Sequence, residues 1–131
     1  MKIVFLNPVA TLGGGELSLL DIFASLRAQA PELDLHLIVG DDGPLVERSR
    51  SHGVMVQVLP FATPLAQLGD AGIAGRPGIN WARVKMTAKL ARAGVSVLAY
   101  SRRLREALRR IAPDLLHSNG FKMHVLAARA T

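Results

Sequence analysis

Residues 2–20 read KIVFLNPVATLGGGELSLL, and this stretch decides the fold. Its first part, from Lys2 to Leu6, is a short run that is apolar on both faces, which is typical of a strand in a parallel sheet covered on both sides. A loop then ends in three glycines at 13–15. From Glu16 onward, apolar side chains recur at spacings of three and four, which predicts a helix with one buried face. Strand, glycine loop and helix in this order indicate an α/β protein.

The same alternation continues along the chain. Further strands are predicted between prolines and glycines, at residues 33–39, 54–59 and 114–117. Helices are predicted at residues 44–52, 81–111 and 121–129. This order predicts a Rossmann-like three-layer sandwich, in which a mostly parallel sheet carries helices on both faces.

The second half of the chain contains the two longest predicted segments. Residues 61–80 are rich in proline and glycine, which predicts a long loop of the kind that often has a function. The helix at 81–111 is expected to kink or break near Gly94. Its buried stripe is predicted to consist of Trp81, Val84, Ala88, Ala91, Val95 and Leu98, continued one turn out of register by Leu104, Leu108 and Ile111.

The composition of the chain excludes several classes of protein. Its 131 residues are half apolar, which suits one compact domain and is too short for two. There is no cysteine, so disulfides and cysteine-ligated zinc or iron–sulfur sites are excluded. No histidine pair has a spacing that suits a metal site, so we predict none. Because no run is long enough to cross a bilayer and the first residues do not resemble a signal peptide, we expect a cytoplasmic protein.

The positive charge is concentrated in one segment. Residues 1–75 carry four basic and eight acidic side chains, whereas residues 76–110 carry ten basic side chains and one acid, Glu106. Such a segment is most often a solvated helix face, but it can also lie against anionic lipid head groups. Nucleic acid is not expected as a partner, because stacking aromatic side chains are nearly absent, with Trp81 and Tyr100 the nearest.

Two bends of the chain are predicted to open onto one crevice. Ligands of doubly wound sheets bind beyond the carboxyl ends of the strands, where the strand order reverses. If the four strands lie in the order 3-2-1-4, the first and the fourth are neighbours at that point. The glycine loop follows the first strand, and His-Ser-Asn-Gly at 117–120 follows the fourth. The predicted site depends on this placement.

The glycine loop has a mechanical use in binding an anion. Gly13, Gly14 and Gly15 have no side chains, so the backbone can come close to a ligand and adopt a positive φ. The helix that follows offers free N–H groups, which favour a pyrophosphate. The spacing matches neither the dinucleotide fingerprint nor a Walker loop. The alternative is a flexible turn that begins a helix, with Glu16 favoured there by the helix dipole.

The second bend offers polar side chains to a ligand. His117, as a neutral imidazole, can hold a hydroxyl or a phosphate oxygen, and Asn119 can do the same without titrating. Lys122, in the first turn of the next helix, can reach an anionic group. The alternative is that His117 is an ordinary strand-end histidine, that Asn119 caps the last helix, and that Lys122 is solvated.

Two motifs together resemble a known family. The first is Gly-Gly-Gly-Glu at 13–16, and the second is PDLLHSNGFK at 113–122. In this order and at this separation they resemble the N-terminal domain of the family 4 glycosyltransferases, over nearly the whole chain. The resemblance implies a GT-B fold, in which two Rossmann-like domains face each other across a cleft. It also implies transfer of a sugar, of the hexosyltransferase type, from a nucleotide-sugar donor to an acceptor with retention at the anomeric carbon, without a metal or other cofactor.

The resemblance also implies roles for individual residues. The N-terminal domain of this family mainly holds the acceptor, a sugar or a lipid-linked sugar, while its glycine loop approaches the donor phosphates. The three glycines would therefore bind phosphate, and Glu16, Asn119 and Lys122 would line the acceptor cleft. Many members carry His-x-His where this chain has His117 and Asn119, so a catalytic, proton-shuttling role would rest on His117 alone.

The same resemblance makes residues 1–131 a single acceptor-side domain, truncated, whose C-terminal nucleotide-sugar domain is missing. We therefore predict that the chain alone does not turn over, and that its exposed sheet edge leads to self-association. Two other functions stay open. One is a stand-alone Rossmann-like module that binds a phosphorylated small molecule, and the other is a docking domain attached peripherally to the inner face of a membrane through residues 81–110.

Overall fold

The computed structural model of the protein describes residues 1–61 and 81–131, so the predicted loop at 61–80 lies outside the described residues except for Phe61. The described elements are, in chain order, β1 (Lys2–Asn7), α1 (Gly14–Gln29), β2 (Asp34–Val39), α2 (Pro44–Ser51), β3 (Met55–Val58), α4 (Trp81–Ile111), β4 (Leu115–Ser118) and α5 (Phe121–Ala130). These bounds agree with the sequence-based predictions to within two residues.

The four strands form one parallel sheet in the order β3-β2-β1-β4, which confirms the predicted order. β1 is a central strand, with β2 on one side and β4 on the other. Ile3, for example, lies opposite Leu35 on the first side and opposite Leu115 on the second. β3 and β4 form the two edges of the described sheet.

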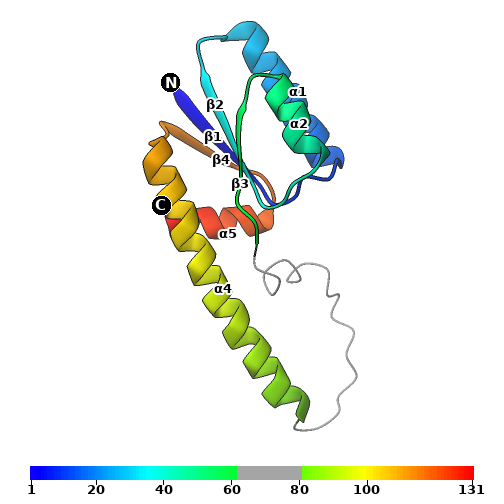
Figure 1. The fold of residues 1–131 in the computed structure, drawn as a ribbon, viewed down its shortest axis with the longest axis vertical. Helices are drawn as coiled ribbons and strands as arrows, with labels where there is room; N and C mark the ends of the chain where they lie inside the picture. The colour runs from blue at the N-terminus through cyan, green and yellow to red at the C-terminus, as the bar shows by residue number, and fades with distance from the viewer. Residues whose placement is uncertain (62–80) are drawn as a thin grey trace.

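Helices cover both faces of the sheet, so the protein has the predicted α/β three-layer architecture (Figure 1). Successive side chains of a strand point to opposite faces. Ile3 and Phe5 therefore pack beneath α1 and α2, where the ring of Phe5 meets that of Phe23 edge-on at 5.0 Å. Val4 and Leu6 face the other way, toward α4 and α5. Both faces of β1 are thus buried, as its continuous apolar run predicts.

Among the described side chains of α4, which begin at Gly94, the fully buried ones start at Tyr100. Tyr100, Leu104 and Leu108 pack against the sheet and α5, as predicted for the last two of them. The prediction was wrong for Val95 and Leu98, whose side chains are 68% and 54% exposed. Part of α4 projects past the sheet, and no strand covers the helix there (Figure 1). The side chains predicted for the stripe between Trp81 and Ala91 lie outside the described residues.

The expected break of α4 at Gly94 is also wrong. The helix runs without interruption over 31 residues. A glycine within a helix costs about 1 kcal/mol relative to alanine, which a helix of this length tolerates. Gly94 is exposed, and a Cβ there would meet nothing within 4 Å.

Gly40, in contrast, is a glycine that the packing requires. It follows β2 and is buried, with its N–H donating to the carbonyl of Asn7. A Cβ at this position would lie 2.3 Å from the carbonyl oxygen of Pro8 and 2.3 Å from the ring of Phe61. The end of β2 therefore packs directly against the loop that leaves β1.

We expect Gly40→Ala to lower the free energy of unfolding by about 1–3 kcal/mol, because the added methyl group overpacks a buried site. Urea unfolding followed by circular dichroism measures the change. Gly94→Ala is the matched control, and we expect it to raise stability by up to about 1 kcal/mol, since alanine is the better helix former. Equal stabilities for the two variants would contradict the close packing at Gly40.

Candidate functional site

The glycine loop begins α1 at the carboxyl end of β1. Gly13 is the N-cap in an extended conformation, and the first helical bond runs from the N–H of Leu17 to the carbonyl of Gly13 at 3.0 Å. Helix geometry leaves the N–H groups of the first turn, including those of Gly14 and Gly15, without partners inside the helix. All three glycines are exposed. The loop therefore presents backbone donors to solvent at the positive end of the α1 dipole.

One expectation about these glycines is wrong. None of the three has a φ in the left-handed region; among the described residues, the glycines that do are Gly53 and Gly120. Gly14 and Gly15 are helical because α1 already begins at Gly14. The second expected property of the glycines, the absence of side chains, does apply. A Cβ on Gly14 would meet nothing within 4 Å, so the backbone of this residue is open to the approach of a ligand.

The second bend, after β4, lies beside the glycine loop, as predicted. A Cβ on Gly15 would lie 3.6 Å from Nδ2 of Asn119. Gly120, with a φ of 81°, lies beside Pro8 of the first loop: a Cβ added to Gly120 would lie 3.3 Å from Cγ of Pro8. The bend needs glycine there, because other residues rarely adopt this conformation. The two bends therefore meet at the reversal point between β1 and β4.

Asn7 joins the two bends and was missed as a site residue by the sequence reasoning, which treated it as part of the loop. It is the last residue of β1, and its side chain is fully buried. Its Nδ2 donates to the carbonyl of Val9 at 2.6 Å and to Oε1 of Glu16 at 3.0 Å, while its Oδ1 accepts from Nδ2 of Asn119 at 2.6 Å. The available signal was a single polar residue that ends an apolar strand.

Asn119 does not have the helix-capping role that was the alternative to ligand binding. The N-cap of α5 is Gly120, without a side-chain hydrogen bond, so Asn119 does not cap this helix. Its side chain donates to Asn7 instead, and its backbone N–H donates to the carbonyl of Leu6 at 2.8 Å. Asn119 therefore continues the β1–β4 contact beyond the end of the strand.

Glu16 is tied to the loop by both carboxylate oxygens. Oε1 accepts from Asn7 and Oε2 accepts from the N–H of Gly13 at 3.1 Å. The residue sits three positions after the N-cap, where a carboxylate is also favoured by the helix dipole. In this structure Glu16 holds the shape of the loop.

His117 and Lys122 flank the second bend. His117 is exposed and lies opposite Phe5 in the sheet, with the two ring centroids 5.3 Å apart, so it faces the α1 side. Lys122 is half-buried in the first turn of α5. Between them, Oγ of Ser118 lies 2.5 Å from Nδ1 of His124, which places a second imidazole at the same end of the sheet.

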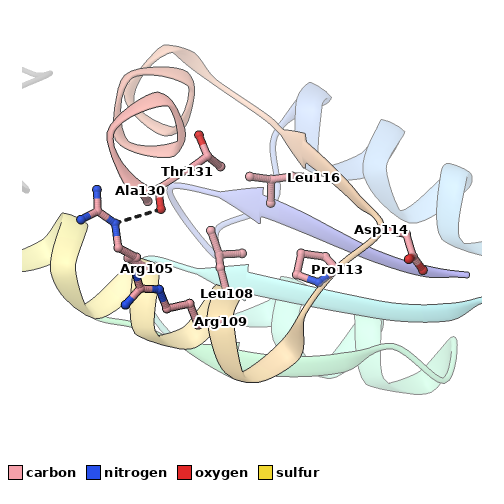
Figure 2. Close-up of a pocket in the computed structure, with 8 residues that line it drawn as sticks. All are labelled: Arg105, Leu108, Arg109, Pro113, Asp114, Leu116, Ala130 and Thr131. Carbon is pink, nitrogen blue, oxygen red and sulfur yellow. Dashed lines mark hydrogen bonds between the residues drawn. The ribbon is translucent and has the colours of Figure 1, made fainter.

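Two open cavities lie away from these bends. The larger, of about 470 Å³, has an apolar floor that includes Leu108 and Leu116, with Arg105 and Arg109 at its side (Figure 2). Arg105 donates to the carbonyls of Arg129 and Ala130 at the end of α5. This cavity opens at the amino end of β4, opposite the predicted site. The smaller cavity, of about 410 Å³, lies at the start of α2.

The fold is shared with two solved structures. Anabaena Alr3699/HepE in complex with UDP is 22% identical over 99% of this chain, with a TM-score of 0.53. The same protein in complex with UDP and glucose gives 22% identity, 99% coverage and a TM-score of 0.54. This chain spans 26% of the length of either neighbour. No protein-family model matches the chain, and no curated protein does. At this level of identity the likeness shows the α/β, Rossmann-like fold alone.

No helix within residues 1–61 and 81–131 is both long enough and apolar enough to cross a bilayer.

We expect Glu16→Ala to destabilise the protein by about 1–2 kcal/mol, because it leaves a buried amide hydrogen of Asn7 and the N–H of Gly13 without their acceptor. Urea unfolding measures this loss. Glu32→Ala, which removes an exposed carboxylate outside the helices, is the control and should stay within about 0.5 kcal/mol of the wild type. If both variants lose the same stability, the hydrogen bonds of Glu16 do not hold the loop.

Proposed function

We propose that this chain is the acceptor-side, N-terminal domain of a nucleotide-sugar-dependent glycosyltransferase of the GT-B, family 4 type, acting with retention at the anomeric carbon. The observation that carries the proposal is the meeting of the glycine loop and the His-Ser-Asn-Gly bend at one end of β1 and β4. The two motifs on which the family resemblance rests are far apart in sequence and adjacent in space.

The neighbours of the fold support the same chemistry. The two Anabaena structures are complexes with UDP and with UDP and glucose. These two molecules are the parts of a UDP-sugar, so a nucleotide-sugar donor and a sugar acceptor are the ligand classes that we propose for this chain. No resident cofactor or metal is part of the proposal.

The residues of the two bends suit different parts of these ligands. The free N–H groups of Gly14 and Gly15 are directed donors that suit the donor diphosphate, with the helix dipole adding to the attraction. We assign the acceptor hydroxyls or phosphate to Asn119 and Lys122, which belong to the second bend and the first turn of α5. We assign catalytic proton transfer to His117, which is exposed at the end of β4.

The chain alone is proposed to bind without turning over. It spans 26% of the length of its structural neighbours, and a donor held by one wall of a cleft lacks the contacts that orient it for reaction. Binding by this chain alone is therefore expected to be weak, with a dissociation constant of about 1 mM, equivalent to a binding free energy of roughly 4 kcal/mol.

We expect UDP and inorganic pyrophosphate, but not uridine, to shift the backbone amide resonances of Gly14 and Gly15 in NMR titrations. Gly14→Ala should weaken this binding by about tenfold, because the methyl group obstructs approach to the N–H groups. The same variant should be as stable as the wild type or up to about 1 kcal/mol more stable, since the methyl group meets no atom within 4 Å.

Other outcomes of this titration would redirect the proposal. Shifts that map away from the glycine loop, or no shifts with any of the three compounds, would overturn the diphosphate site. Micromolar binding of a dinucleotide by the chain alone would instead favour a stand-alone module for phosphorylated small molecules. In that case a thermal-shift series would show stabilisation that saturates with ligand concentration.

A second candidate function is docking to an anionic membrane surface through α4. The observation that favours it is the exposure of Val95 and Leu98, three residues apart on one helix face, which the exposed Arg102 continues four residues further on. Apolar side chains followed by arginines along one face suit the boundary between acyl chains and anionic head groups. This function is compatible with a lipid-linked acceptor.

We expect the protein to co-sediment with vesicles of phosphatidylcholine containing phosphatidylglycerol, and less so as the salt concentration rises. Leu98→Glu should reduce the bound fraction several-fold, because it removes apolar contact and adds repulsion. Met55→Glu, at a similarly exposed residue on β3, is the matched control and should bind as the wild type does. Binding that ignores both salt and Leu98→Glu would contradict this mode of docking.

A further inference from the structure

Asn7 is a buried polar side chain that directly follows the four apolar residues 3–6 of β1. The relative exposure of Asn7 is 0%, and its neighbours in β1 belong to the two hydrophobic clusters of the sheet. Burying an amide without hydrogen bonds costs several kcal/mol in an apolar setting, so its three bonds are needed for the fold to tolerate it. A hydrophobic residue would avoid this requirement, so the value of asparagine at this position lies in the groups that its hydrogen bonds connect.

The bonds of Asn7 form one continuous path between the bends. The path runs from Asn119 through Asn7 to Glu16, and from Glu16 to the N–H of Gly13. An ionised carboxylate only accepts hydrogen bonds, so the Nδ2 group of Asn7 must face Glu16 and its Oδ1 must face Asn119. The carboxylate of Glu16 therefore determines the orientation of the Asn7 amide. The Oδ1 of Asn7 in turn requires that the Nδ2 group of Asn119 face it.

We infer that Asn7 is a positioning residue, whose side-chain amide couples the glycine loop to the β4–α5 bend so that both present their ligand-binding groups in one arrangement. This inference rests on the proposed function only for the identity of the ligand. Asparagine is suited to the role because it is a donor toward Glu16 and an acceptor toward Asn119 within one short side chain. Substitution by aspartate keeps the shape and the acceptor but removes the donor.

Asn7→Asp makes the coupling depend on pH. The new carboxylate replaces an amide nitrogen that lies 3.0 Å from Oε1 of Glu16, so two carboxylates would share one site. At pH 8 both are ionised and repel each other, which separates Glu16 from β1 and frees the Gly13 N–H. Near pH 5 one proton shared by the pair restores the bridge, because like charges at this distance raise one apparent pKa of the pair.

The experiment follows the Gly13 amide by NMR and hydrogen exchange at pH 5 and pH 8, with pyrophosphate titrated at each pH. We expect Asn7→Asp at pH 8 to lose protection at Gly13 and to bind pyrophosphate about tenfold more weakly than the wild type, and to approach the wild type at pH 5. Dividing the dissociation constant of the variant by that of the wild type at the same pH cancels the effect of the protonation of pyrophosphate itself. Gln29→Glu adds the same charge at the far end of α1, and its ratio should not change with pH.

The outcomes separate this inference from the proposed function. If the wild type does not bind pyrophosphate but Gly13 in the variant still responds to pH, the function fails and the coupling stands. If the variant binds as well as the wild type at pH 8 with Gly13 protected, the coupling is overturned. Should Asn7→Asp not fold, Asn119→Ala replaces it. Asn119 donates its side-chain hydrogen bond to Asn7 and the Gly13 N–H donates to Glu16, so faster exchange at Gly13 in Asn119→Ala is the result that the coupling requires. Unchanged exchange at Gly13 overturns the coupling.

Discussion

The central position of β1 is the constraint on which the rest of the structure depends. The strand pairs with β2 on one side and β4 on the other, and helices cover both of its faces. Its last residue therefore ends in a place that water does not reach, and every polar group there must find a partner in the protein. The backbone of Asn7 bonds Gly40 and its side chain bonds both bends, so the requirement for satisfied hydrogen bonds also assembles the candidate site.

Glu16 presents an electrostatic difficulty for an anion site. A carboxylate in the first turn of α1 repels a phosphate that approaches the same N–H groups. The structure reduces this effect by using both oxygens of Glu16 internally, on Asn7 and on Gly13. Hydrogen bonds to a carboxylate spread its charge and hold it on the side of the loop that faces β1. The free donors of Gly14 and Gly15 then remain on the side that faces solvent.

The sequence was sufficient for the order and type of the elements, because strands that are apolar on both faces and helices with one apolar stripe have different periodicities. It also predicted that the two bends meet, since the carboxyl ends of neighbouring parallel strands share one edge. It was insufficient for Val95 and Leu98, because periodicity shows which side of a helix is apolar but not whether another element covers it. The role of Asn7 was equally hidden, since its three bonds join parts of the chain that only the fold brings together.

The glycines of the chain divide into those that the fold requires and those that it does not. Gly40 is required by packing and Gly120 by its φ of 81°. Gly14 and Gly15 are helical, and a Cβ would make at most an ordinary contact at either position. Two glycines in a first helical turn reduce helix propensity relative to alanine, by up to about 1 kcal/mol each, with no gain in packing. The lower helix propensity of Gly14 and Gly15 is therefore a cost in stability that packing does not offset. The two glycines lie where N–H groups face solvent, and the absence of side chains there is what a ligand needs in order to come close to the backbone.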